Sequence, residues 1–162
     1  MRYDVGILQY LYPGEVAPGK PKANTTEVHA SLGYGWVDAA VHVVTSNDAW
    51  TWGNGGGGDS ARGSTYYDLN AEIPIGDLLK TKWTDGVTGI LHYGYQHFAG
   101  AGNNIDSYGD WKVGLNKSFE SNGIDVGYYY TGTDTRNDGW FTYYDGKIYS
   151  DPAHTIYMTK SF

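Results

Sequence analysis

The chain has 162 residues, a length that fits a single domain and is sufficient for a closed sheet. Its net charge of −7 disfavours a nucleic-acid partner, because phosphate binding needs a basic face, and the lack of Cys excludes disulfides, zinc–thiolate sites and thiol catalysis. No segment contains the roughly 18 consecutive apolar residues that a membrane-spanning helix needs.

Eight segments alternate between apolar and polar residues, which is the pattern of β-strands. In chain order, the predicted strands occupy residues 3–12, 25–34, 36–45, 64–75, 87–98, 109–119, 123–132 and 154–162. Most of them exceed the length of about five or six residues that is typical of globular strands. They are close to the length that crosses a bilayer when a strand is tilted.

Each predicted strand has an apolar face and a polar face. In the third strand, Val41 and Val43 lie opposite His42, and in the fourth, Leu69 lies opposite Asp68. In a soluble barrel or sandwich the apolar face points inward, whereas in an outer-membrane barrel it points to lipid. Alternation alone does not distinguish these two architectures.

The predicted connections alternate between long and short. The long ones are rich in Gly, Asn, Asp and Pro and lie near residues 13–24, 46–63, 99–108 and 133–153. The connections around Gly35 and at residues 120–123 are tight, and the one at residues 76–86 is intermediate. Long loops at one end and tight turns at the other are typical of outer-membrane barrels.

Short motifs along the chain carry a resemblance to a known family. They occupy residues 3–6 (YDVG), 12–14 (YPG), 27–35 (EVHASLGYG), 64–67 (STYY), 108–117 (YGDWKVGLNK) and 158–162 (MTKSF). On these motifs the chain resembles the TorF family of porins, a group of proteobacterial outer-membrane proteins. Members of that family are longer, with a signal peptide and additional N-terminal strands, so this chain resembles about the C-terminal two-thirds of a member.

The resemblance implies an all-β, antiparallel, transmembrane up-and-down β-barrel in the bacterial outer membrane, with about eight strands and with residues 1–162 as one barrel domain. Whether further strands lie upstream of Met1 is left open. Phe162 resembles the terminal residue that the outer-membrane assembly machinery recognises, so the expected partners are the lipid bilayer and that machinery. A homo-oligomer is left open. Because side chains fill an eight-stranded barrel, a water-filled channel needs upstream strands or another subunit.

Nine charged or imidazole side chains fall on the polar face, which is the inferred lumen face: Glu27, His29, Asp38, His42, Asp68, Glu72, His92, Lys112 and Asp125. The carboxylates in this set favour cations over anions. An equally weighted alternative is a paired polar plug that fills a narrow barrel. The three His match no ligand spacing, so no metal or cofactor is expected.

No nucleophile motif such as G-x-S-x-G is present, so an enzyme is not expected. The segment from Trp50 to Gly58 lacks the Lys and the strand-to-helix context of a phosphate-binding loop, and we interpret it as a flexible external loop with aromatic tips.

The sequence therefore predicts an outer-membrane porin that passes small hydrophilic solutes or ions, with a weak cation preference. One alternative is a non-conducting structural or adhesive barrel. Another is a soluble lipocalin-like carrier, which would bury Leu69 and Ile73 and expose Asp68.

Overall fold

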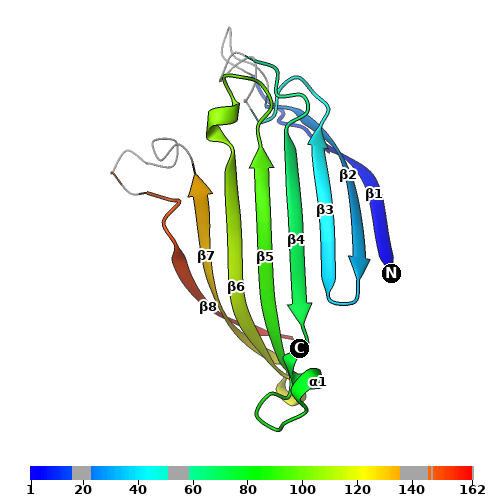
Figure 1. Cartoon of the computed structure of the whole chain (residues 1–162), viewed down its shortest axis with the longest axis vertical. Helices are drawn as coiled ribbons and strands as arrows, with labels where there is room; N and C mark the ends of the chain where they lie inside the picture. The colour runs from blue at the N-terminus through cyan, green and yellow to red at the C-terminus, as the bar shows by residue number, and fades with distance from the viewer. Residues whose placement is uncertain (16–22, 51–58, 136–145, 147, 162) are drawn as a thin grey trace.

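The computed structural model describes residues 1–15, 23–50, 59–135, 146 and 148–161. Within them the chain forms one antiparallel sheet of eight strands, in which each strand pairs with its neighbours in sequence (Figure 1). The strands are β1 (Arg2–Tyr10), β2 (Thr25–Tyr34), β3 (Val37–Val44), β4 (Thr65–Ile73), β5 (Val87–His97), β6 (Tyr108–Phe119), β7 (Ile124–Thr135) and β8 (Ala153–Lys160). The predicted all-β, antiparallel, up-and-down arrangement is confirmed.

Local chemistry explains where strands begin and end. β4 stops at Ile73 because Pro74, which follows it, has no backbone N–H to donate to a ladder. β2 and β3 are joined by Gly35 and Trp36, and Gly35 has a φ of 58°, which glycine adopts without strain. The third strand consequently starts one residue later than the sequence predicted.

The two faces of the sheet have opposite chemistry. We call the face that carries His29, His42 and His92 the inner face, and the opposite one the outer face. Large apolar side chains stand exposed on the outer face: Tyr3, Val5, Ile7, Val28, Leu32, Val37, Tyr67, Leu69, Leu91, Tyr93, Val113, Leu115, Val126, Tyr128, Ile156 and Met158. No layer of the described chain covers them.

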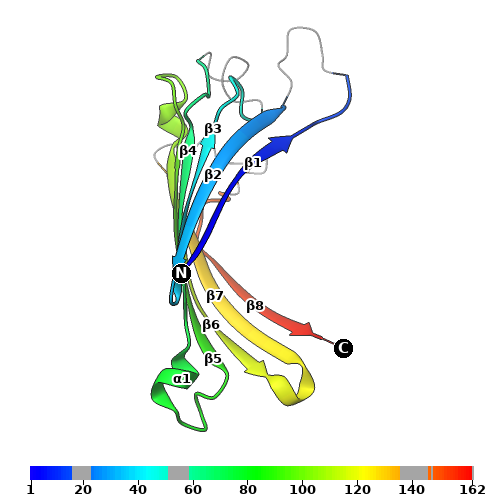
Figure 2. The same ribbon diagram turned by 90° about the vertical axis from the view of Figure 1, so that its right-hand side faces the viewer.

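The sheet is curved but does not close. Its edge strands β1 and β8 bend toward the same side (Figure 2), and within the described residues neither pairs with a strand beyond its sequence neighbour. The expected closed ring is therefore not formed by these strands. A closed ring of eight strands encloses an interior just wide enough for side chains, and the inner face carries large rings such as Tyr66, Tyr129 and Tyr157.

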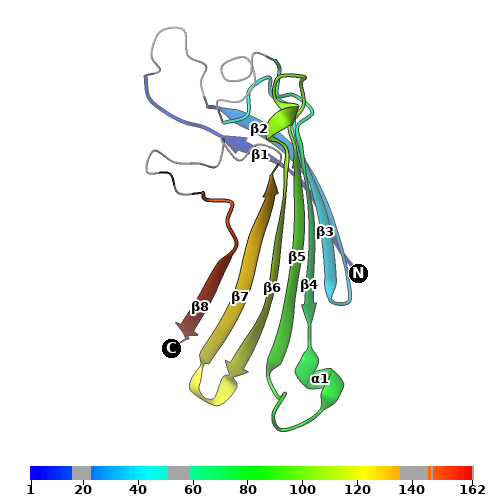
Figure 3. The ribbon, with the colours of Figure 1, turned by 60° about the vertical axis from the view of Figure 1, so that its left-hand side comes forward.

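The connections separate into two ends of the sheet, as the sequence predicted. The turn at Gly35, the 3-10 turn Glu120–Asn122 and the helix α1 (Ile75–Leu79) lie at one end, and the described parts of the other connections lie at the opposite end (Figures 1 and 3). The sequence did not predict α1 or the two 3-10 turns, the second of which is Asn104–Asp106. No helix in the described part of the chain is long and apolar enough to span a membrane.

Among the described residues, a buried apolar cluster lies at the long-loop end and consists of Val44, Ala49 and Ala61. Trp50 packs against it, donates its backbone N–H to the Thr25 hydroxyl over 2.7 Å, and meets the Tyr10 ring edge-on with centroids 5.6 Å apart. These contacts hold Trp50, the first residue of the loop that the sequence analysis interpreted as flexible. Residues 51–58 and Phe162 lie outside the described residues.

Candidate functional site

The strand register places all nine candidate residues on the inner face. Directly paired residues in an antiparallel sheet point to the same face, and His29 pairs with His42, while His92 pairs with Lys112. The residues gathered in this way are Glu27, His29, Asp38, His42, Asp68, Glu72, His92, Lys112 and Asp125.

His92 is the centre of a hydrogen-bonded cluster in the middle of the sheet. Its Nε2 lies 2.7 Å from an Asp110 carboxylate oxygen, and its Nδ1 lies 2.9 Å from Asn70 Oδ1 and 3.2 Å from Asp68 Oδ1. Asn70 in turn donates to Asp68 over 2.7 Å. The His92 side chain is only 16% exposed. Each ring nitrogen therefore has an oxygen partner, which fixes the orientation of the imidazole.

Tyr66 completes the cluster from β4. Its hydroxyl donates to Asp110 over 3.1 Å and lies 3.4 Å from His92 Nε2. Gly94 leaves room for this contact, since a Cβ there would come within 2.6 Å of the Asp110 carboxylate. Tyr66, Asn70 and Asp110 were missed as site residues, although Asp110 has the same strand parity as the candidate Lys112 and the alternation could have identified it.

A second polar cluster lies on β1 to β3. His29 Nε2 is 2.7 Å from an Asp4 carboxylate oxygen, and the His29 ring stacks on His42 with centroids 5.5 Å apart. Glu27 lies beside them and is only 6% exposed. Gly6 faces His29 on the neighbouring strand, where a Cβ would approach the ring to 2.5 Å. Asp4 and Gly6 were not among the sequence candidates.

The remaining candidates are dispersed. Asp38 pairs with Arg2 over 2.9 Å at an exposed position, where an ion pair contributes little stability. Asp125 accepts from the Ser118 hydroxyl over 2.5 Å, and Glu72 is exposed. Lys112 places its ammonium 5.8 Å from the centroid of the Tyr129 ring. The nine residues therefore form one face but not one site.

Carboxylates dominate the charge of the inner face. Within the described strands it carries Asp4, Glu27, Asp38, Asp68, Glu72, Asp110 and Asp125. The cations among those strand positions are Arg2 and Lys112. A surface with this excess attracts cations.

An open hollow of about 480 Å³ adjoins the His92 cluster, and Lys112, Tyr129 and Asp151 are among its lining residues. In the part of the chain that the structure describes, no three His, Cys, Asp or Glu side chains are grouped so that they could hold a metal ion. The residues that line the hollow carry hydrogen-bonding and charged groups, which can contact a hydrated solute.

The whole chain, residues 1–162, matches a protein family that is described as "Bacterial protein of unknown function (Gcw_chp)". The chain belongs to this family. A comparison with curated proteins gives no match, and neither does a comparison with solved structures. Membership establishes a bacterial family, whose description assigns no function.

Proposed function

We propose that this chain is part of an outer-membrane β-barrel that lets small hydrophilic solutes and ions diffuse passively, with a preference for cations. The proposal includes residence in the bacterial outer membrane and a resemblance to the TorF porins. It requires no catalytic residue and no cofactor.

One observation carries the proposal: the apolar face of the sheet is the exposed one. On the outer face of the central strands, Leu69 is 48% exposed and Tyr93 is 56% exposed, whereas Glu27 and His92 on the inner face are largely covered. Contiguous apolar patches of this extent are rare on soluble monomers. Apolar-out and polar-in alternation is the pattern of strands that contact lipid.

The lengths and connections of the strands support the same proposal. The strands run from 8 residues in β3 to 12 in β6 and β7, and about 9 to 11 residues cross a bilayer when tilted. Tight turns at one end and long loops at the other match the asymmetry of outer-membrane barrels. The TorF motifs lie mainly on these strands.

The open edges define what a conducting ring needs. Unpaired N–H and C=O groups in hydrocarbon cost several kcal/mol each, so β1 and β8 must pair in the membrane with each other or with further strands. A ring of eight is filled by side chains. Passive diffusion therefore requires strands beyond the described eight, from the same protein or from another copy.

The experiment is a conductance measurement in planar bilayers, with a salt gradient to report ion selectivity. We expect discrete current steps and a reversal potential on the cation-selective side. Glu72→Gln removes an exposed inner-face carboxylate and should reduce the cation preference without loss of conductance.

Asp134→Asn is the matched control, because Asp134 is exposed and its pairing with Gly109 places it on the outer face. It should leave selectivity unchanged. Membrane-inserted protein that never conducts would contradict the proposed porin.

Packing at the long-loop end favours a second candidate, a non-conducting barrel that presents its loops to a partner. Gly102 N–H donates to Asp59 over 2.8 Å, and Ala99 N–H donates to the Ser64 hydroxyl over 2.9 Å, so two loops are held together. Inserted protein without conductance, together with loss of partner binding when residues 46–63 are shortened, would support this candidate. The soluble carrier is disfavoured because Leu69 is exposed.

A further inference from the structure

The connection between β4 and β5, residues 74–86, lies at the short-turn end of the sheet (Figure 2). It carries exposed apolar and basic side chains. Trp83 is 91% exposed, and Leu78 and Leu79 of α1 are also exposed. Lys80 and Lys82 lie between Leu79 and Trp83 in the chain. Trp and Lys beside exposed Leu are typical of segments that lie at a membrane–water interface.

One side of this connection forms an apolar groove on the outer face of the sheet. The groove has a volume of about 470 Å³, and its lining includes Trp83, Val87, Leu115, Val126, Tyr128 and Ile156 together with Asn116 and Lys117. Its lining is mainly hydrocarbon and aromatic carbon, which favours a hydrocarbon chain over a polar ligand.

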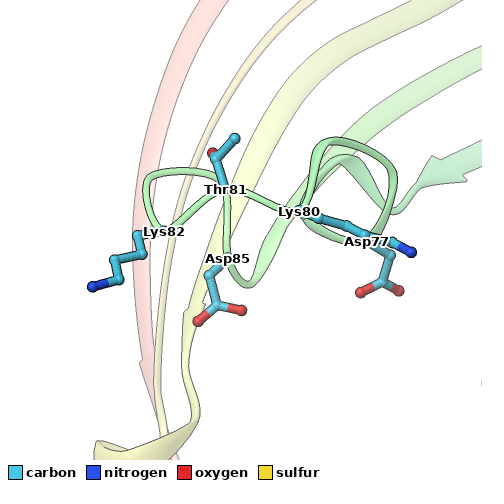
Figure 4. Close-up of a pocket in the computed structure, with 6 residues that line it drawn as sticks. Asp77, Lys80, Thr81, Lys82 and Asp85 are labelled. Carbon is cyan, nitrogen blue, oxygen red and sulfur yellow. The ribbon is translucent and has the colours of Figure 1, made fainter.

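The other side of the connection forms a charged hollow of about 570 Å³ (Figure 4). Gly76 and Thr81 contribute to its lining, and its charges come from Lys80, Lys82, Asp77 and Asp85. Figure 4 shows the two lysine side chains pointing to opposite sides of the connection, while both carboxylates point the same way. The hollow therefore offers equal numbers of cationic and anionic groups.

A hydrogen bond joins the groove to the hollow. The Lys117 ammonium donates to the backbone carbonyl of Asp85. Lys117 lines the groove and Asp85 lines the hollow, so an apolar and a charged compartment meet at this contact. An occupant of both must have a hydrocarbon tail next to a head that carries both signs of charge.

We propose that this connection binds a zwitterionic phospholipid whose head group has a phosphate and a primary ammonium. The proposal rests on the membrane insertion proposed above. One acyl chain occupies the groove beside Trp83, and the phosphate pairs with the ammonium group of one of the two lysines, which point to opposite sides of the connection. The lipid ammonium donates to the Asp77 and Asp85 carboxylates, which point the same way. A choline head group has no N–H to donate, and a purely anionic head group leaves both carboxylates facing like charge.

The test measures fluorescence quenching of Trp83 by lipids with brominated acyl chains. The protein is reconstituted in phosphatidylcholine vesicles that contain a small fraction of brominated phosphatidylethanolamine or of brominated phosphatidylcholine. The difference between wild type and Trp83→Phe isolates the Trp83 signal. We expect the ethanolamine lipid to associate about tenfold more strongly, the equivalent of one charge-assisted hydrogen bond.

The double variant Asp77→Asn, Asp85→Asn should abolish this preference while Trp83 is still quenched by both lipids. Glu120→Gln removes an exposed carboxylate at the same end of the sheet, outside the hollow, and should keep the preference. In protein that floats with the vesicles, two outcomes would overturn the phospholipid site: equal quenching of wild-type Trp83 by both lipids, or no quenching by either. Protein that does not float would contradict membrane insertion and the site together.

Discussion

Single glycines on the inner face set how closely strands and side chains approach. At Gly114 in β6, a Cβ would lie 2.5 Å from the Tyr128 carbonyl oxygen and 2.7 Å from the Tyr129 Cβ. Both atoms belong to the neighbouring strand and cannot rotate away. Gly114→Ala should therefore reduce the free energy of unfolding by about 1–3 kcal/mol, as overpacking does elsewhere. Urea unfolding of the reconstituted protein measures this change.

Gly109 of the same strand is the control. The nearest atom to a Cβ there is the Tyr93 hydroxyl oxygen at 3.5 Å, an ordinary contact distance. Gly109→Ala should change the free energy of unfolding by less than about 0.5 kcal/mol. Equal effects of the two substitutions would show that the close approach at Gly114 is not a determinant of strand packing.

The His92 cluster is a second feature at the residue scale. His92→Leu leaves Asp68 and Asp110 without their imidazole partner in a half-buried place, and we expect a loss of about 1–3 kcal/mol in the free energy of unfolding. A double-mutant cycle with Asp110→Asn should give a coupling energy of about 1 kcal/mol. Additive effects would mean that the 2.7 Å contact does not contribute to stability.

At the scale of elements, one side chain ties the edge strand β8 to β6. The Tyr157 ring covers Gly127 of β7, and its hydroxyl donates to Asn116 Oδ1 over 3.0 Å. An aromatic ring over a strand glycine replaces the packing that the glycine lacks. Tyr157 therefore spans the strand between β8 and β6.

Tyr157→Ala should accelerate amide hydrogen exchange throughout β8 while exchange in β4 and β5 stays unchanged, because local opening needs only the edge strand to detach. Tyr157→Phe keeps the ring over Gly127 and loses a single hydrogen bond, worth about 1 kcal/mol. Its exchange should lie close to wild type. Uniform acceleration in all strands would contradict a local role.

Strand positions and faces could be predicted from the sequence because period-two alternation is local and strong. The prediction of residues 25–34 for the second strand agrees with β2 to the residue. The helix α1 was missed because five residues after Pro74 carry too little periodicity to identify a helix. The contacts of Tyr66 with Asp110 were missed because they depend on register across β4, β5 and β6, which alternation within one strand does not determine.

At the scale of the whole molecule, the two faces should respond oppositely to an added charge. Leu69 lies on the exposed outer face, and Ser31 lies on the inner face opposite Asp4. If the outer face contacts lipid, Leu69→Arg places a cation in hydrocarbon at a cost of about 2–4 kcal/mol near the midplane. Ser31→Arg places the same charge beside a carboxylate on the polar side.

We therefore expect Leu69→Arg to lower the folded fraction in vesicles, whereas Ser31→Arg inserts like wild type. Protease protection after vesicle flotation measures both. If the outer face met water instead of lipid, the order of the two variants would reverse. Leu69 would be a core position only under a second layer, so without one an arginine there is exposed and improves solubility. Wild-type protein that stays monodisperse without detergent, together with equal behaviour of the two variants, would show that the outer face does not contact lipid.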